Sequence, residues 1–255
     1  MASPDGRHFG LQDRFPKVFG FQGGLCRNDN ALILFSFWGK KMVYRTEATS
    51  IGGFIQQLAV SFVGKGYFFY VIGSIPEGKN PRVIDDKIIA RYGIDISKWA
   101  RARRKQAGTA NLQYIRFERF FVILATHGRH RFFDDEASCI KDARRRPIRF
   151  AGYSVSYRCG HPHVRIEQEE YKQMKAYFLR LAVHRSLVTL ERELASISFE
   201  PYAPVRRQLL CILRAVNRAR KKAGFTPVTK HVFRFKRRIY RPFESIRGED
   251  APLAA

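Results

Sequence analysis

The sequence predicts an α+β fold, a mostly antiparallel sheet with a helical C-terminal layer. Short runs rich in aromatic and β-branched residues predict strands between residues 67 and 166, and the spacing of apolar residues predicts helices almost throughout residues 169–223. Hydrophobic residues make up 45% of the chain and charged residues 27%, which is ordinary for a globular protein and excludes intrinsic disorder.

The first predicted helix covers residues 51–62. Thr49 and Ser50 are good N-cap residues, apolar side chains then recur at helical spacing, and Gly64 and Gly66 end the run. The apolar segment that follows, YFFYVIGSI, predicts a central strand because it is rich in β-forming residues.

Two helices with clear boundary signals come next. Asn80 caps the first, which has Pro81 at its first position and Gly93 just past its end. Ser97 caps the second, whose sequence KWARARRKQA is strongly basic and which ends at Gly108.

The middle of the chain predicts four strands and one helix. Three acids, Asp134, Asp135 and Glu136, suit a helix N-terminus and are expected to open that helix. The strands are expected at residues 112–117, 120–126, 149–157 and 163–166, the last two forming a hairpin.

The C-terminal part predicts a helical layer followed by one more strand. From Glu169 the chain is expected to be helical almost to Ala223, with breaks near Ser186 and at residues 201–204. A strand-like segment, Val232–Tyr240, closes the ordered region.

Three regions follow from this pattern. Residues 1–41, rich in Gly and Phe, are expected to form a weakly structured N-terminal arm, residues 42–166 an α/β core domain, and residues 167–255 a basic helical region with a strand-like tail. The regular pattern begins at Met42, which leads to the hypothesis that Met42 is the native start.

The formal net charge of +25 lies mostly in the C-terminal part of the chain. Residues 98–255 carry 35 basic and 14 acidic residues, and four short segments within them hold 22 basic residues and one acid. A charge segregated in this way points to a polyanionic partner, nucleic acid first and an anionic membrane surface second.

The clearest basic segment is the predicted helix at residues 205–222. Val205 and Leu209 fall on one stripe of this helix, Arg214 and Arg218 fall on the opposite stripe, and no acid interrupts the cations. We expect one face to pack in the core and the other to contact phosphates, with a solvated charged face as the alternative.

Three further segments repeat the charge pattern: the helix at residues 98–105, the cluster around Pro147 and the tail. The residues expected to contact nucleic acid are Lys98, Arg101, Arg103, Arg104, Lys105, Arg144, Arg145, Arg146, Arg207, Arg214, Arg218, Lys221, Arg234, Lys236, Arg237 and Arg238.

In the tail, Phe233 and Phe235 alternate with Arg234 and Lys236. On a strand this alternation places rings on one side and cations on the other, which suits the stacking of bases in single-stranded DNA or RNA. In the alternative interpretation, both phenylalanines belong to the core. A membrane surface is disfavoured because the apolar face of the helix at residues 205–222 lacks bulky aromatics.

Several classes of function lack support in the sequence. No apolar run approaches the roughly 18–20 residues of a membrane helix. The Walker A, G-x-G-x-x-G and G-x-S-x-G patterns are absent, so nucleotide hydrolysis and α/β-hydrolase chemistry are not expected. Four widely spaced cysteines without C-x-x-C fit reduced thiols and a cytoplasmic location.

The segment His161–Pro162–His163 is the strongest candidate for chemistry. On a strand its two imidazoles project to the same face and can ligate one metal ion. With a tyrosine on a later helix, the pair resembles the HUH endonucleases of rolling-circle replication and single-strand transposition. The resemblance implies a Mg²⁺ or Mn²⁺ ion that polarises the scissile phosphate, with Tyr171 or Tyr177 as the nucleophile.

Two other interpretations of these histidines stay open. In one, both cap a hairpin near the basic surface. In the other, Cys159 joins them in a zinc site that needs a fourth ligand such as Cys139.

The sequence thus predicts a nucleic-acid-binding protein, a DNA- or RNA-processing factor whose basic segments converge on one face. The alternative is a metal-dependent, HUH-type single-strand endonuclease that uses His161, His163 and a tyrosine. A basic structural protein bound to ribosomal or capsid nucleic acid is a third class. No membrane partner is expected.

Overall fold

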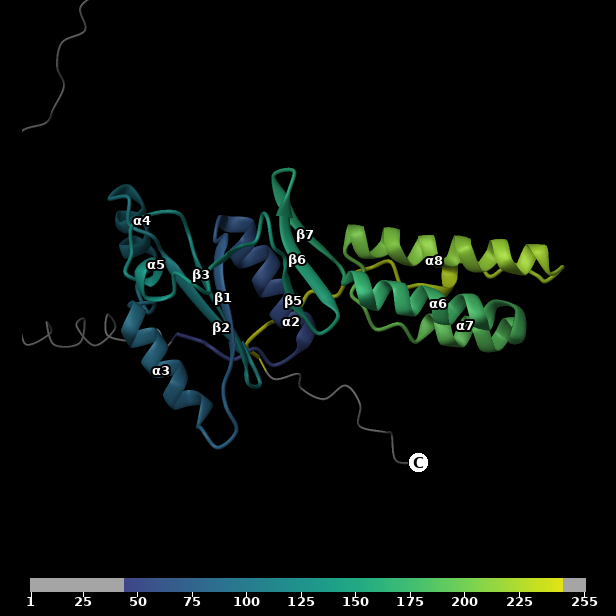
Figure 1. The fold of residues 1–255 in the computed structure, drawn as a ribbon, viewed down its shortest axis with the longest axis horizontal. Coiled ribbons are helices and arrows are strands. Elements are labelled where there is room, and N and C mark those ends of the chain that lie inside the picture. Colours follow the sequence, from purple (N-terminus) through teal and green to yellow (C-terminus); the bar gives the residue numbers. More distant parts are fainter. Residues whose placement is uncertain (1–43, 245–255) are drawn as a thin grey trace, which may run out of the picture. The chain divides into compact units, whose positions relative to one another are not determined.

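The computed structural model describes residues 44–244, so the predicted N-terminal arm and Met42 lie outside the described residues. The described residues belong to one compact unit, and the boundary expected between residues 166 and 167 falls inside it. Two antiparallel sheets and a helical C-terminal region confirm the α+β class (Figure 1). Within this part of the chain no helix is both long and apolar enough to cross a membrane.

The first sheet has four antiparallel strands in the order β2-β3-β1-β4. Their bounds are β1 Phe69–Ser74, β2 Leu112–Phe117, β3 Phe120–Ala125 and β4 Lys141–Asp142. Tyr70 pairs with Leu124 and Tyr114 pairs with Ile123, and all four side chains are buried. The strands predicted from the β-rich runs in this region are confirmed.

Three helices accompany the first sheet: α3 Pro81–Tyr92, α4 Lys98–Gln106 and α5 Phe132–Asp135. Asn80 and Ser97 cap α3 and α4 as the sequence predicts, each accepting a backbone N–H of the first turn. The prediction for α5 is wrong in its bounds. Its acids lie at the end of a four-residue helix, because the buried Phe132, whose N–H donates to His130 Nδ1, begins it.

A continuous helical segment lies between the two sheets. It consists of α2 Ile51–Gln56, a π-helical turn η1 Gln57–Phe62 and a 3₁₀ turn η2 Val63–Lys65. Phe54 and Leu58 are buried in one cluster with Ile115 of the first sheet and Val155 of the second. Gly66 has a φ of 93° and ends the segment, as predicted.

The second sheet has three antiparallel strands in the order β5-β6-β7, with bounds β5 Ile148–Phe150, β6 Tyr153–Arg158 and β7 His161–Ile166. The single strand expected at residues 149–157 is wrong, because the chain reverses at Ala151 and Gly152, with φ angles of 46° and 75°. The hairpin across Cys159 and Gly160 is confirmed.

The helical layer consists of α6 Gln168–His184, α7 Leu187–Ala195 and α8 Ala203–Lys222 (Figure 1). The predicted apolar stripe of α8 is buried with Phe178 of α6 and Leu190 of α7. The Gln208 side chain accepts the Ile166 N–H at 2.8 Å and donates to the Ile166 oxygen at 3.0 Å. These two bonds fix the N-terminal part of α8 to the end of β7.

The strand expected at Val232–Tyr240 is wrong. A 3₁₀ turn, η3 Lys230–Val232, is followed by irregular chain up to residue 244. The N–H and oxygen of Tyr240 bond to the two ends of the Gln56 side-chain amide, at 3.1 and 2.8 Å. Because a side chain satisfies this part of the tail backbone, the tail needs no neighbouring strand.

Candidate nucleic-acid interface

The second sheet has one apolar and one polar face, because side chains alternate along each strand. Tyr153 and Val155 point into the core with Ile148. The opposite face, which we call the polar sheet face, carries Arg149 of β5, Ser154, Ser156 and Arg158 of β6, and His161, His163 and Arg165 of β7. Three strands therefore bring basic and hydroxyl side chains together on one surface.

Cations outnumber acids on the polar sheet face. Arg149 pairs with Glu167, with 3.0 Å between Nη1 and Oε1, and Arg165 donates to Gln168 Oε1 at 2.6 Å. Within residues 44–244, Arg158 has no acidic partner. Two of the three guanidinium groups are thus left without a carboxylate.

Ser154 and Ser156 form the floor of a small cavity in this face. Their exposed fractions are 7% and 4%, so neighbouring side chains cover them almost completely. The cavity has a volume of about 160 Å³, and its walls include the three arginines of the polar sheet face, Glu167 and Gln168. Hydroxyl and guanidinium donors therefore line one half-open cavity.

The two histidines project from the same face of β7, as their spacing predicts. His161 is exposed, and its Nδ1 lies 2.9 Å from the Cys159 carbonyl oxygen. His163 is half-buried, and its Nδ1 has no hydrogen-bond partner among the described residues. Burial lowers the pKa of His163, and the charges of Arg158, Arg165, His161 and Arg207 lower it further. The imidazole is therefore neutral at pH 7.

The structure does not gather a metal site around these histidines. In the described range no three His, Cys, Asp or Glu side chains lie close enough together to hold a metal ion. Tyr171 packs against the helical core, which raises its pKa through burial, and the Tyr177 hydroxyl lies 3.4 Å from Glu193. Neither predicted nucleophile hydrogen-bonds to a histidine in this part of the chain, and Cys159 is an exposed free thiol.

Helix α8 presents a row of exposed cations opposite its buried stripe. The row consists of Arg207, Arg214, Arg218 and Lys221, as the sequence predicts. The described residues offer none of the four an acidic partner within 4.0 Å. Arg207 precedes Gln208, whose side chain binds the backbone of Ile166 at the end of β7, so the row, which we call the α8 row, begins beside the second sheet.

Some cations of helix α4 pack against the rest of the fold, and others are exposed to solvent. Arg104 donates to the Gly93 oxygen at 3.2 Å, and Arg101 is half-buried with its Nε enclosed. The neighbouring Trp99 is 75% exposed. Its ring is therefore available to stack on a base, and the sequence did not single it out. The exposed cations of α4 are Lys98, Arg103 and Lys105.

An ion pair between Arg144 and Asp142 stabilises the turn after β4. Arg144 binds both oxygens of Asp142, with Nε–Oδ1 3.0 Å and Nη2–Oδ2 2.7 Å, and lies over the Phe68 ring at 4.8 Å. This guanidinium holds the pKa of Asp142 below its usual range. Arg145 and Arg146 are exposed and carry no ion pair with a described residue.

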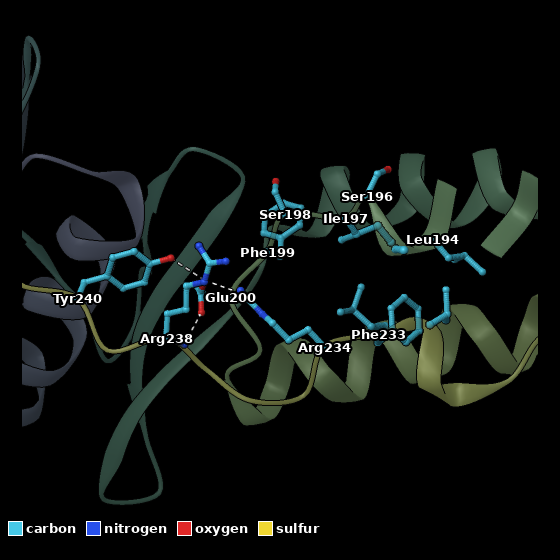
Figure 2. Close-up of a pocket in the computed structure, with 13 residues that line it drawn as sticks. Leu194, Ser196, Ile197, Ser198, Phe199, Glu200, Phe233, Arg234, Arg238 and Tyr240 are labelled. Carbon is cyan, nitrogen blue, oxygen red and sulfur yellow. Dashed lines mark hydrogen bonds and ion pairs between the residues drawn. The ribbon is translucent and has the colours of Figure 1, made fainter. Parts of the chain in front are cut away.

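A second cavity, of about 310 Å³, lies between α7, α8 and the tail (Figure 2). The buried Glu200 accepts hydrogen bonds there from Arg234 Nη2 at 2.7 Å, Tyr240 Oη at 2.6 Å and the Arg238 N–H at 3.1 Å. Figure 2 shows the three donors converging on this carboxylate. Arg234, a predicted contact residue, is thus held by the fold.

The tail phenylalanines belong to the core. Phe233 is 6% exposed in the helical cluster, and Phe235 packs against the same cluster. Arg237 lies over the Tyr202 ring at 4.9 Å, whereas Lys236 and Arg238 are exposed. The alternation read from the sequence is preserved, but its rings point inward and are not placed to stack on bases.

Comparisons with known proteins do not assign the chain to a family. No protein-family model matches it, and no curated protein matches its sequence. The chemistry of the polar sheet face and the α8 row therefore carries the functional inference.

Arg158, Arg165 and the two serines of the cavity were missed as site residues by sequence reasoning. They are isolated along the chain and lie outside the basic runs. The signal that would have found them is the two-residue alternation of YSVSYR and HVRI, which places them on one polar face across a hairpin.

Proposed function

We propose that the protein binds nucleic acid through the polar sheet face and the α8 row. The observation that carries the proposal is the gathering of cations from three elements. Arg158 and Arg165 lie on the same face of the β6–β7 hairpin as the half-buried His163. Arg207 precedes Gln208, whose side chain binds the backbone of β7. Cations gathered in this way repel one another, and a phosphate backbone relieves that repulsion. Guanidinium groups also match phosphate oxygens in geometry.

Salt dependence tests this proposal. Binding of a fluorescent 20-nucleotide strand is measured by anisotropy between 50 and 200 mM salt, as DNA and as RNA. If the seven cations of the two surfaces contact phosphates of the single strand, log K falls against log[salt] with a slope of about −5. A flat response would overturn the proposal.

A triple variant assigns the binding to this surface. Replacing Arg158, Arg165 and Arg207 by Gln is expected to reduce the salt slope by about 2 to 3. The matched control replaces Lys79, Arg82 and Lys87, three exposed cations in and before α3, by Gln. Equal losses in the two triple variants would show that net charge alone drives binding, and would contradict the proposed surface.

A metal-dependent single-strand endonuclease is the second candidate, favoured by the projection of His161 and His163 from one face of β7. Labelled single-stranded DNA of varied sequence is incubated with the protein and Mn²⁺. The candidate requires cleavage that the His163→Ala variant lacks. Intact DNA in every sequence tested would reject it.

A further inference from the structure

We infer that the cavity in the polar sheet face binds the terminal phosphate of a nucleic-acid strand in preference to an internal phosphodiester. The inference rests on the proposed function, since it names the part of the nucleic acid that the polar sheet face selects. It concerns the cavity whose floor is Ser154 and Ser156 and whose walls include Arg149, Arg158 and Arg165.

The size of the cavity suits one phosphate group. Its volume is about 160 Å³, and a water molecule in the liquid occupies about 30 Å³. A tetrahedral oxyanion and a few waters therefore fit. Pockets that enclose a whole drug-sized ligand begin at about 300 Å³, so the sugar and base of a nucleotide stay outside.

The donors around the cavity match a tetrahedral oxyanion. Ser154 and Ser156 lie two residues apart on β6, about 7 Å along the strand, so their hydroxyls flank a group seated between them. Ser156 donates over 3.4 Å to the His163 oxygen, and residues 44–244 offer the Ser154 hydroxyl no partner. Arg158 and Arg165 add two planar guanidinium groups, and no carboxylate of the described residues pairs with either.

The charge of the cavity favours a dianion. Its walls hold three guanidinium groups and the single carboxylate of Glu167, and the neighbouring His163 is neutral. The net charge of the lining is therefore +2. A phosphate monoester carries about −1.5 to −2 at pH 7, whereas an internal phosphodiester carries one negative charge. The terminal group thus neutralises the lining more completely.

The test compares strands that differ at one end. Three 12-nucleotide strands of the same sequence carry a 5′-phosphate, a 3′-phosphate or hydroxyls at both ends, with the label at an end that carries no phosphate. At fixed salt we expect one phosphorylated strand to bind about tenfold tighter than the hydroxyl strand, the worth of one further charge-assisted hydrogen bond. Inorganic phosphate at matched ionic strength should remove this preference and leave the hydroxyl strand bound.

Variants locate the preference in the cavity. Ser154→Val fills the floor, Ser154→Ala removes its hydroxyl alone, and Arg158→Gln removes one guanidinium. Each should bring the ratio of the two affinities close to one. As a control, Arg214→Gln on the α8 row should weaken both strands equally and keep the ratio.

The outcomes separate this inference from the proposed function. Equal affinity of wild-type protein for phosphate and hydroxyl ends, with a steep salt dependence, overturns the terminal-phosphate inference and leaves the proposed function intact. A preference that survives both Ser154 variants, checked for folding by circular dichroism, also overturns it. Absence of salt-dependent binding to any strand overturns both.

Discussion

At the scale of single residues, the pKa of His163 is sensitive to the electrostatic potential of the proposed binding surface. Burial and then three arginines and His161 lower its pKa below the ordinary 6.5. A bound polyanion offsets those positive charges, so we expect the pKa of His163 to rise when nucleic acid binds. The measurement is an NMR titration of the histidine ring signals with and without a saturating oligonucleotide.

The same shift fixes the direction of two pH dependences. Because the unfolded chain takes up this proton near pH 6.5 and the folded chain takes it up at lower pH, His163 makes the fold less stable as pH falls through that window. Nucleic-acid affinity changes in the opposite sense and rises as pH falls through the raised pKa that His163 has in the complex. His163→Gln should remove this part of the affinity change. An unchanged pKa in the complex would show that the nucleic acid binds elsewhere.

Asp85 is a buried acid that joins α3 to β2 of the first sheet. It is 2% exposed on α3 and accepts hydrogen bonds from Tyr114 at 2.5 Å, from Arg116 Nε at 3.1 Å and from Thr46 at 2.9 Å. Asp85→Ala removes the buried carboxylate of this ion pair and leaves the buried Arg116 only the half-exposed Glu47, so we expect a loss of about 3 kcal/mol in the free energy of unfolding. Urea denaturation followed by circular dichroism measures this loss.

The matched control for Asp85 is Glu47→Gln. Glu47 pairs with the same Arg116 at 3.1 Å, but its side chain is 51% exposed. Water screens that pair, so its removal should cost less than about 1 kcal/mol. Similar losses in the two variants would contradict the assignment of the stability to the buried pair.

At the scale of elements, Glu200 joins the tail to the linker between α7 and α8. The buried carboxylate accepts hydrogen bonds from Arg234, from Tyr240 and from the backbone of Arg238. Burial and Glu200 raise the pKa of Tyr240 to about 12, which keeps its hydroxyl a donor. Glu200→Ala is expected to lower the free energy of unfolding by about 2 kcal/mol and to release the tail backbone at Arg237 and Arg238, so that trypsin cuts there. Limited proteolysis with mass spectrometry detects the new cuts.

Glu244→Gln is the control for the tail prediction. Glu244 pairs with Arg241, three residues away, and both side chains are more than half exposed. This pair contributes little, so the tryptic pattern should not change. Equal protection of the tail in the Glu200→Ala variant and the wild type would show that Phe233 and Gln56 hold the tail without the carboxylate.

The elements that the sequence predicted well are those with local signals. Asn80 and Gly93 mark both ends of α3, and the apolar stripe of α8 follows its helical period. The turn at Ala151 and Gly152 was missed because alanine rarely adopts a positive φ, and a single glycine inside an alternating pattern also fits a bulge in a continuous strand. The tail was predicted as a strand from its alternation, but Gln56 and Glu200, distant in sequence, satisfy its polar groups.

At the scale of the whole molecule, the sequence showed which segments are basic but not how their cations are arranged in space. The α8 row follows from a helical period, whereas the polar sheet face arises when β5, β6 and β7 pair, and its link to α8 depends on the Gln208 side chain at Ile166. Such long-range contacts leave no local signature. Arg234 is likewise bound to Glu200, 34 residues away, by a contact that the basic run does not reveal.

Variants of the basic helix α4 test whether the cationic segments form one continuous binding surface. Its Arg104 is held by Gly93 near the first sheet, whereas the α8 row continues from the second sheet along the helical layer (Figure 1). The row spans about 21 Å, the rise of fourteen helical residues, which equals about six base pairs of duplex. We therefore expect a 10-nucleotide strand to bind the polar sheet face and the α8 row without reaching α4.

Two strand lengths distinguish one surface from two. In a variant with Lys98, Arg103 and Lys105 replaced by Gln, affinity for a 10-nucleotide strand should change by less than about twofold, because no phosphate reaches those positions. Affinity for a 40-nucleotide strand should fall about tenfold or more, since a longer strand can follow the chain's charge to α4 and the exposed Trp99. Anisotropy at one salt concentration measures both. An equal loss for the two lengths would mean that α4 contacts the same short stretch of nucleic acid as the α8 row.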